Sequence, residues 1–279
     1  MTDARPLPDI ALNDGRTIPP LGFGVWQLPE TGTQATVAAA LRAGYRSIDT
    51  AAAYGNEAGV GRAVRDATVA RDDLFVTTKL WNDRQGYDAT LRAFDESLAR
   101  LGLDAVDLYL IHWPCPGREL YVATWQALVR LREEGRARSI GVSNFTEGTL
   151  ERIVGETGVT PAVNQIELHP AFQQRALREV HARLGIVTEA WSPLGQARFL
   201  DDPTLAAIAR RHGRTPAQVV LRWHVESGLV AIPKTATPAR IAENLDLFGF
   251  ALTPEDRAAL AGLDRPDGRI GPDPETFGA

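Results

Sequence analysis

The sequence predicts an α/β fold in which eight parallel strands and their helices close into a single (β/α)8 barrel, the TIM barrel. Eight short strand-like runs recur along the 279 residues, helix-type windows follow most of them, and no linker or shift in composition interrupts the series. Short apolar runs are typical of parallel strands that are buried on both faces. A barrel of this kind needs about 250 residues plus additions, so we expect one domain over residues 1–279.

A β-hairpin is expected before the barrel. Residues 9–22 read DIALNDGRTIPPLG, in which Asp14 and Gly15 form a turn signal between apolar residues. We expect this hairpin to close the bottom of the barrel. The predicted barrel strands are LGFG (21–24), YRSID (45–49), LFVTTK (74–79), VDLYLIH (106–112), RSIGVSN (138–144), PAVNQIE (161–167), IVTEAWS (186–192) and LVAIPK (229–234).

Helical periodicity separates these strands. In residues 87–102, YDATLRAFDESLARLG, four large apolar residues at 91, 94, 98 and 101 fall at helical spacing. The tail after Leu263, DRPDGRIGPDPETFGA, is rich in Gly and Pro and predicts a loop. We expect this C-terminal loop to fold over the mouth of the active site.

The competing fold is a doubly wound dinucleotide-binding domain. Such a domain needs a G-x-G-x-x-G run that opens a helix after the first strand. The runs GFGVWQ (22–27) and GVGRAV (59–64) each supply two glycines and lack the third. The Tyr-x-x-x-Lys pattern of another reductase class does not occur either, so the barrel is the better prediction.

Composition excludes several classes of function. The net charge is -5 and the basic residues are dispersed among acids, which argues against nucleic acid or an anionic membrane as the partner. The longest uncharged stretch, residues 17–29, is too short and too polar to span a bilayer, and MTDARPLPDI lacks the basic start and apolar core of a secretory signal. With one cysteine and no His-Glu-x-x-His, no metal site is expected. We expect a cytoplasmic protein.

The functional site of a (β/α)8 barrel lies at the carboxyl ends of its strands. For any one polar residue there, a structural role is a fair alternative, because Asp or Ser caps the next helix and an isolated lysine is usually solvated. The placement of several such residues together at one rim is not explained by helix capping, since Lys, Gln and Trp are poor caps. The residues at the predicted strand ends are Asp49, Lys79, His112, Ser143, Asn144, Gln165, Trp191, Ser192 and Lys234.

The stretch YRSIDTAAAYGNE, residues 45–57, adds a phenol to this rim, Tyr54. A free tyrosine has a pKa of about 10; the ammonium of Lys79 would lower that pKa, and the carboxylate of Asp49 would hold the ammonium in place. His112 would hydrogen-bond a substrate oxygen and stabilise negative charge that develops there. This set suits reduction of a carbonyl with Tyr54 as the proton donor. The hydride must come from a cofactor, because no side chain supplies one.

The sequence resembles the aldo-keto reductases over nearly its whole length. The resemblance rests on DTAAAYGNE, TTKLW, DLYLIHWP, SIGVSNF, AVNQIELHP, WSPLGQ and IPKTATPARIAENL, in the order and spacing of that family. Within the family, TTKLWND, NQIELHPAFQQR and TPAQVVLRWH are most similar to the bacterial 2,5-diketo-D-gluconate reductases. The resemblance implies an NADP-dependent oxidoreductase (EC 1.1.1.-) that reduces aldehydes or ketones to alcohols. Its catalytic tetrad would be Asp49, Tyr54, Lys79 and His112.

The resemblance also implies NADPH as the cofactor. Ser143, Asn144 and Gln165 would hydrogen-bond the nicotinamide carboxamide, since amides and hydroxyls match that group. Trp191 would stack on the ring and fix the face presented to substrate. The residues implied along the pyrophosphate are Ser192, Leu194 and Gln196.

At the adenine end, the resemblance implies that Lys234, Thr235 and Arg240 hold the 2'-phosphate of NADPH, because a phosphate calls for cationic donors. Glu243 and Asn244 would reach the adenine. Without the resemblance, an ordinary surface helix with Pro at its first turn is the better interpretation of this segment. In diketogluconate reductases a further arginine is expected near position 237, where this chain has Thr. NADPH stays the predicted cofactor, with more tolerance of NADH.

The predicted substrate pocket is aromatic. Its candidate walls follow strand ends or stand in the tail, and aromatic walls with few polar anchors are typical of small-molecule sites, although large aromatics are also ordinary core residues. Arg269 in the tail is a candidate to attract an acidic sugar or is solvated. The leading candidate substrate is a keto-sugar acid such as 2,5-diketo-D-gluconate, beside methylglyoxal and other small carbonyls. The candidate pocket residues are Phe23, Trp26, Trp81, His112, Trp113 and Phe277.

Two alternatives remain open from the sequence. An NADPH-binding sensor or regulatory subunit with little turnover would carry the same site residues, and a reactive aldehyde would separate it from an enzyme. A metal-dependent barrel lyase or hydrolase would need carboxylates or histidines at several strand ends, and only Asp49 and His112 meet that need. The resemblance implies a monomer.

Overall fold

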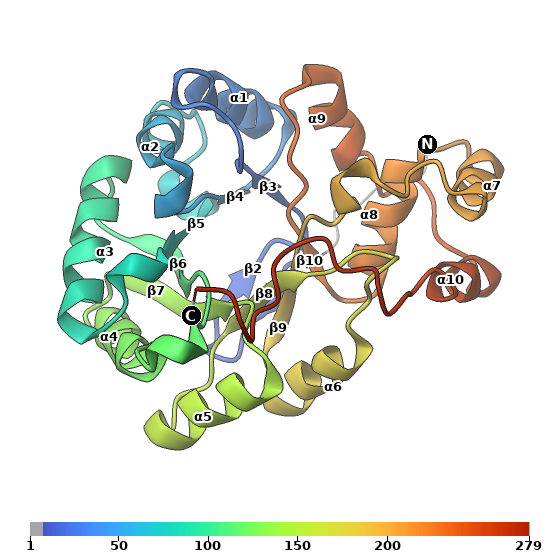
Figure 1. Ribbon diagram of the computed structural model, residues 1–279. Coiled ribbons are helices and arrows are strands. Elements are labelled where there is room, and N and C mark those ends of the chain that lie inside the picture. The colour runs from blue at the N-terminus through green and yellow to red at the C-terminus, as the bar shows by residue number, and fades with distance from the viewer. Residues whose placement is uncertain (1–7, 279) are drawn as a thin grey trace.

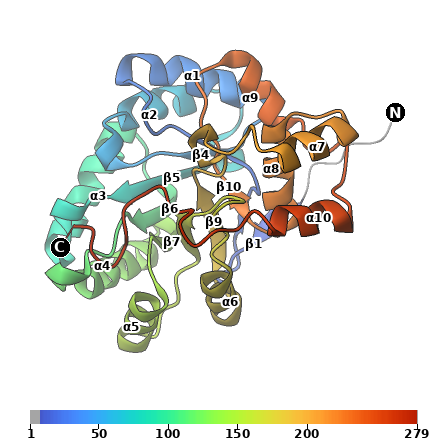
Figure 2. The same cartoon turned by 45° about the vertical axis from the view of Figure 1, so that its right-hand side comes forward.

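The computed structural model describes residues 8–278. Most of the N-terminal stretch for which no secretory signal is expected, residues 1–7, lies outside the described residues. Figure 1 shows a ring of strands surrounded by helices, and Figure 2 shows the same arrangement from the side. The predicted (β/α)8 barrel is confirmed.

The barrel wall consists of parallel strands in sequence order, from β10 through β9, β8, β7, β6, β5 and β4 to β3. A parallel bridge between Leu21 and Ala231 joins the first strand to the last and closes the barrel. The carbonyl of Pro20 accepts a hydrogen bond from the Ala231 amide at 3.0 Å across the same seam. The strand bounds are β3 Gly22–Gly24, β4 Ser47–Asp49, β5 Phe75–Leu80, β6 Val106–Ile111, β7 Ala137–Ser143, β8 Val163–Glu167, β9 Val187–Trp191 and β10 Val230–Ala231.

The predicted hairpin is confirmed as two short antiparallel strands, β1 Ile10–Ala11 and β2 Thr17–Ile18. Gly15 in its turn has a φ of +85°, a left-handed conformation that glycine adopts without steric cost. Ile18 is fully buried beside Leu108, Val163 and Val230. These contacts plug the amino-terminal end of the barrel, so the open end is the other one.

Helices cover the outside of the strands, as Figure 1 shows. The predicted helix over residues 87–102 is confirmed as α3, and Gly102 ends it with a φ of +61°. Helices α7 and α10 pack against each other outside the repeating βα series. The helix bounds are α1 Glu30–Ala43, α2 Glu57–Arg65, α3 Tyr87–Leu101, α4 Tyr121–Glu133, α5 Glu147–Thr157, α6 Arg175–Leu184, α7 Pro203–His212, α8 Pro216–Glu226, α9 Pro238–Leu245 and α10 Pro254–Ala261.

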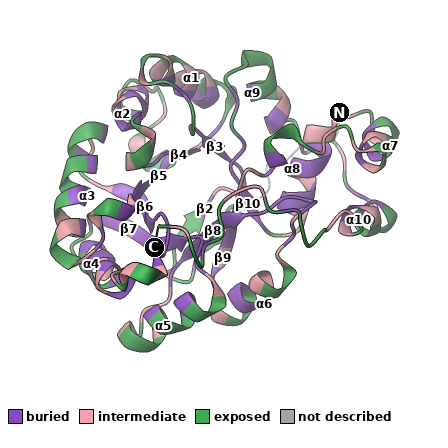
Figure 3. Cartoon of the chain, viewed as in Figure 1, coloured by how far each residue is buried: buried purple, intermediate pink, exposed green. Residues whose placement is uncertain are grey.

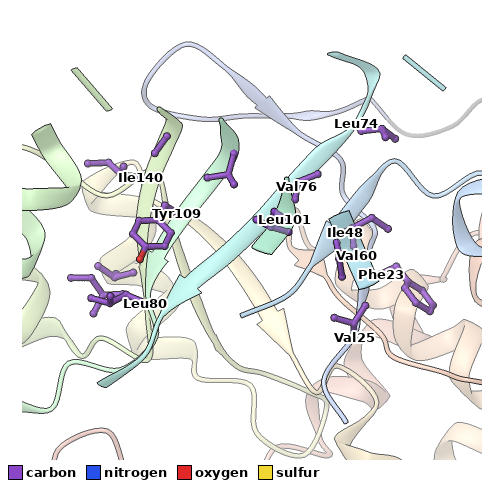
Figure 4. Close-up of a cluster of buried hydrophobic side chains, with 14 of the residues drawn as sticks. Phe23, Val25, Ile48, Val60, Leu74, Val76, Leu80, Leu101, Tyr109 and Ile140 are labelled. Atoms are coloured by element: carbon purple, nitrogen blue, oxygen red, sulfur yellow. The ribbon is translucent and has the colours of Figure 1, made fainter. Parts of the chain in front are cut away.

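Side chains alternate along each strand between the barrel interior and the helices. Figure 3 shows the barrel strands as largely buried and the outer faces of the helices as exposed. The main apolar core lies between the strands and the helices, and Figure 4 shows part of it around Phe23, Ile48 and Tyr109. Helices α2 and α3 approach closely at Gly61, where an added Cβ would lie 1.8 Å from the carbonyl oxygen of Leu101.

The side chains that point into the barrel at its carboxyl end are polar. In the strand register Gly24 pairs with Asp49, Asp49 with Thr77, and Ser143 with Gln165. Because all of these strands run in one direction, their last residues meet at one rim. The side chains that could take part in a reaction therefore lie at that rim.

Candidate active site

A cavity of about 770 Å³ opens at the carboxyl end of the barrel. It is bounded by strand ends, by the loop after β9 and by the C-terminal tail, and its wall combines aromatic rings with polar side chains. The predicted residues that line it are Trp26, Asp49, Tyr54, Trp81, His112, Trp113, Ser143, Asn144, Gln165, Trp191, Ser192, Leu194, Gln196 and Lys234.

A buried ion pair lies beneath this cavity. The Lys79 ammonium, which is fully buried, donates to Asp49 Oδ1 at 2.6 Å and to the Thr50 carbonyl at 2.9 Å. Burial lowers the pKa of Lys79, but Asp49 and Tyr54 outweigh it, so the net pKa is raised. Lys79 therefore stays cationic.

Tyr54 ends the short 3-10 helix η1, Ala52–Tyr54, which follows β4. Gly55 next to it has a φ of +66°, so the chain turns sharply and leaves the phenol at the cavity wall. The Lys79 nitrogen lies 5.2 Å from the centre of the Tyr54 ring. Burial raises the pKa of Tyr54 and Lys79 lowers it, with burial the larger effect. The expected lowering by Lys79 is present, but the expected net decrease in this pKa is wrong for the protein without ligand, because the sequence carries no measure of burial.

His112 follows β6 and faces the same space. Its ring centre lies 5.6 Å from that of Tyr54 and 5.1 Å from that of Trp81, both edge to face. Burial and the Lys79 charge hold the pKa of His112 well below its usual range. The imidazole is therefore neutral at pH 7, and a neutral imidazole can donate one N–H to an oxygen in the cavity.

Three of the predicted nicotinamide-site residues form one hydrogen-bonded network. The Asn144 amide nitrogen donates to the His112 carbonyl and to Ser143 Oγ, each at 3.0 Å. Its oxygen accepts from the Trp191 indole nitrogen at 2.7 Å. Asn144 has a φ of +63°, a conformation that Asn tolerates better than most residues. The network fixes the indole plane against one side of the cavity.

Sequence reasoning missed Glu189, a buried acid on β9. The Gln165 amide nitrogen donates to Asp49 Oδ2 and to Glu189 Oε2, both at 2.8 Å. Burial and the nearby Asp49 raise the pKa of Glu189 to about 8. Its only sequence signal is an acid at an inward position of a buried strand.

A second missed acid, Glu167 at the end of β8, binds the tail. Its two oxygens accept from the backbone amides of Ile270 at 2.6 Å and Gly271 at 2.8 Å. An added Cβ at Gly271 would lie 2.5 Å from the Trp191 ring, so the tail crosses the indole closely. Figure 1 shows the tail in red across the open end of the barrel, as expected.

Phe277 packs on Trp113 with ring centres 4.6 Å apart, next to the cavity rather than on its wall. Arg269 does not line the cavity either, and its guanidinium stacks on Phe172 at 4.8 Å. The prediction for Phe23 is wrong. Its side chain is fully buried between β3 and the helices, against Tyr45, because Gly22 and Gly24 occupy the inward positions of that strand and Phe23 the outward one.

The residues predicted to bind the phosphate and the adenine lie at one end of the cavity or beyond it. Lys234 is exposed and lines it, and Arg240 is exposed on the first turn of α9. Thr235 is buried and its hydroxyl accepts from the Thr237 amide at 3.0 Å. Glu243 accepts from the Thr215 hydroxyl at 2.7 Å, so one of its oxygens is engaged. The last residue predicted there, Asn244, is buried on α9.

Within residues 8–278, no group of three or more His, Cys, Asp or Glu side chains is placed to hold a metal ion. Nor is any helix in this range long and apolar enough to cross a membrane.

Comparison with known proteins agrees with this geometry. The model of the aldo/keto reductase family matches residues 20–265. A methylglyoxal reductase, DkgA of Yersinia pestis, is 53% identical over 98% of both chains. The structure of a Gox0644 mutant in complex with NADPH is 54% identical, covers 96% of this chain and 98% of its own, and superposes with a TM-score of 0.93. A structure described as a putative 2,5-diketo-D-gluconic acid reductase B is 39% identical over 95% of each chain, with a TM-score of 0.91. The chain belongs to the aldo/keto reductase family.

Proposed function

We propose that this protein is an NADPH-dependent oxidoreductase that reduces the carbonyl group of small aldehydes or ketones to an alcohol. The observation that carries the proposal is the arrangement of Asp49, Lys79, Tyr54 and His112 at the base of an aromatic cavity. A cation beside a phenol and a neutral imidazole facing the same space suit protonation of a carbonyl oxygen.

The residues around the cavity fit a reduced nicotinamide. Trp191 offers a flat wall that Asn144 holds in place. The Gln165 amide oxygen has no hydrogen-bond partner among the described residues and is available to a carboxamide. When bound, the reduced nicotinamide supplies a hydride to the carbonyl carbon. The relative solved with NADPH supports this choice of cofactor.

In the reaction, Tyr54 gives its proton to the carbonyl oxygen as that oxygen gains negative charge. Lys79 stabilises the phenolate that remains, and Asp49 keeps the ammonium within reach through a 2.6 Å contact. The neutral His112 donates a hydrogen bond to the same oxygen and so orients the carbonyl. The buried ion pair needs no rearrangement during this step, which is the condition for electrostatic stabilisation.

The pyrophosphate of the cofactor would lie along Ser192, Leu194 and Gln196, with the adenine end beyond it. Lys234 and Arg240 supply two exposed cations for the 2'-phosphate. Thr235, Glu243 and Asn244 are proposed as the remaining contacts at this end. Because position 237 is Thr, fewer charges hold the phosphate, and we propose that NADH is also accepted.

For the substrate, the cavity favours a small neutral carbonyl over a keto-sugar acid. Among the described residues that line it, Lys234 is the one positively charged side chain that is not paired, and it lies at the cofactor end. Three aromatic side chains, Trp26, Trp81 and Trp113, also line the cavity. The DkgA relative is named a methylglyoxal reductase, and methylglyoxal is such a compound. We further propose that the chain acts as one barrel domain, as a monomer and in the cytoplasm.

The test is loss of reduced-nicotinamide absorbance with purified protein, NADPH or NADH, and a panel including methylglyoxal and 2,5-diketo-D-gluconate. We expect turnover that prefers NADPH and methylglyoxal. The variant Tyr54→Phe keeps the ring and removes the proton, so it should bind NADPH normally and lose about a hundredfold or more in kcat. Full activity of this variant would refute the assigned role of Tyr54.

The regulatory-subunit alternative predicts a different result. Tight NADPH binding by the wild-type protein with no turnover on any carbonyl of the panel would favour it over the enzyme.

A further inference from the structure

We propose that Glu189 is a positioning residue: it holds the Gln165 amide with its oxygen toward the cavity, and it is uncharged while Tyr54 releases its proton. The inference rests on the proposed function, because it concerns how the same site holds the nicotinamide and supplies the proton. Glu189 belongs to none of the roles assigned above.

The first step is the orientation of Gln165. An amide NH2 group has two hydrogens, and both are used, one by Asp49 Oδ2 and one by Glu189 Oε2, each at 2.8 Å. Asp49, which binds the Lys79 ammonium, accepts one of these hydrogens, so the nitrogen of Gln165 points at Asp49 and the acceptor oxygen of Glu189 takes the other hydrogen. The amide oxygen of Gln165 then points away, toward the cavity that Gln165 lines. The Gln165 oxygen, fixed in this way, can accept a hydrogen bond from a ligand, and the NH2 group of the nicotinamide carboxamide is a suitable donor.

The second step is the environment of Glu189. It pairs with Gln165 on β8 and Val230 on β10 in the strand register, and its side chain is 1% exposed. It forms no ion pair with any described residue, and its Oε1 has no hydrogen-bond partner. A carboxylate so placed lacks the contacts that normally offset the loss of water, so the geometry favours the neutral carboxyl. A protonated carboxyl keeps one acceptor oxygen for Gln165.

The third step concerns the charges that face Glu189. They are Asp49 from β4, Lys79 from β5 and Tyr54 from η1; the residues paired with it on β8 and β10 carry no charge. Asp49 and Lys79 already balance each other at 2.6 Å. An ionised Glu189 would add an unbalanced negative charge, which disfavours a phenolate at Tyr54. Reduction is therefore faster when Glu189 is neutral.

This arrangement predicts the direction of a pH effect. Burial and Asp49 raise the pKa of Glu189 to about 8, so the group is neutral below that pH and ionised above it. The rate of carbonyl reduction should fall as the pH rises through about 8, by about tenfold if the added charge raises the Tyr54 pKa by about one unit.

The first experiment uses Glu189→Gln, a neutral isostere that removes a buried ionisable group. We expect the fall in kcat between about pH 7 and about pH 10 to be lost in this variant. Infrared difference spectra of the cofactor-free protein should show the carbonyl band of a protonated carboxyl in the wild type and not in this variant. The control is Glu226→Gln, on α8 and bound to Arg222 at 2.6 Å away from the site, which should keep both features.

The second experiment uses Glu189→Leu, which removes one of the two acceptors and leaves Asp49 alone to hold the Gln165 amide. NADPH binding, followed by quenching of tryptophan fluorescence, should weaken about tenfold, the loss of roughly one hydrogen bond. An analogue in which the carboxamide NH2 is replaced by methyl, the reduced 3-acetylpyridine form, cannot donate to Gln165. Its affinity should be the same in wild type and variant.

The outcomes separate this inference from the proposed function. If the wild type binds and oxidises NADPH but Glu189→Gln retains the alkaline fall and the infrared band, Glu189 does not have this role. Equal weakening of NADPH and the analogue in Glu189→Leu would overturn the orientation of Gln165. Failure of the wild type to oxidise NADPH with any carbonyl would count against the proposed function instead.

Discussion

The contact between Glu167 and the tail should control how often the active-site mouth is open. Glu167 is 1% exposed and accepts from the amides of Ile270 and Gly271 with its two oxygens. The substitution Glu167→Gln keeps the shape of the side chain. It replaces one of these acceptors by an NH2 group that faces a backbone N–H, so one hydrogen bond is lost and two donors are brought together.

The magnitude follows from the number and kind of contacts. A hydrogen bond to a charged group contributes about 1.5–3 kcal/mol, so we take about 2 kcal/mol for the loss of one of the two. At about 1.4 kcal/mol for each factor of ten, the population with the tail detached should rise by about thirtyfold. The tail supplies Gly271 and Pro272 to the cavity wall, so the KM for the carbonyl substrate should also rise.

Limited digestion with trypsin measures this population directly. Arg269 lies in the tail one residue before the anchored amides and is exposed, and the bond after it becomes extended and accessible when the tail detaches. When opening is fast relative to cleavage, the cleavage rate follows the open population. We expect cleavage after Arg269, read by intact mass, to accelerate by about thirtyfold in Glu167→Gln.

The matched control is Glu275→Gln, the same substitution at an exposed tail position whose side chain makes no hydrogen bond or ion pair with the described residues. It should be cut at the wild-type rate. Equal cleavage rates in Glu167→Gln and the wild type would refute the reasoning that these two hydrogen bonds hold the tail.

Two further predictions concern the cofactor and the packing of the helices. Arg240→Ala should raise the KM for NADPH at least about tenfold and leave the KM for NADH nearly unchanged, because only NADPH carries the phosphate that Arg240 would bind. Equal increases in the KM for NADPH and for NADH would contradict this role of Arg240. The control is Arg210→Ala, which removes an exposed arginine on α7 and should change neither KM. Gly61→Ala should lower the free energy of unfolding in urea by about 1–3 kcal/mol or more, because its Cβ would lie 1.8 Å from the Leu101 oxygen. Gly155→Ala in α5 meets no atom within 4 Å and should be neutral or stabilising by about 1 kcal/mol; the same loss in both variants would show that crowding at α2 and α3 is not the cause.

The fold was largely predictable because its evidence is local. The order of short apolar runs and helical windows is enough to place β3 to β10, and the predicted run at residues 45–49, for example, contains β4, Ser47–Asp49. Once the strands are parallel, their carboxyl ends must share an edge. Asp49, His112 and Gln165 could therefore be brought together before any distance was known.

Other features of the site depend on distances that the chain does not encode locally. Phe23 lies within a strand near its end and Trp81 just after one. Phe23 enters the core and Trp81 the cavity, because adjacent strand residues face opposite sides. The alternation around Gly22 and Gly24 could have revealed this. Glu167 and Glu189 were missed because an acid in a strand acquires meaning only from the groups packed against it.

By itself, the sequence determined the barrel, the direction of its strands and the identity of the side chains at one rim. Only the tertiary structure decided the state of those side chains. The pKa of Tyr54 is raised because burial outweighs Lys79, and Gln165 presents its oxygen because Asp49 and Glu189, from two other strands, take both of its hydrogens. Periodicity and strand direction follow from neighbouring residues, whereas burial, charge and hydrogen bonding are sums over groups that meet only when the barrel closes.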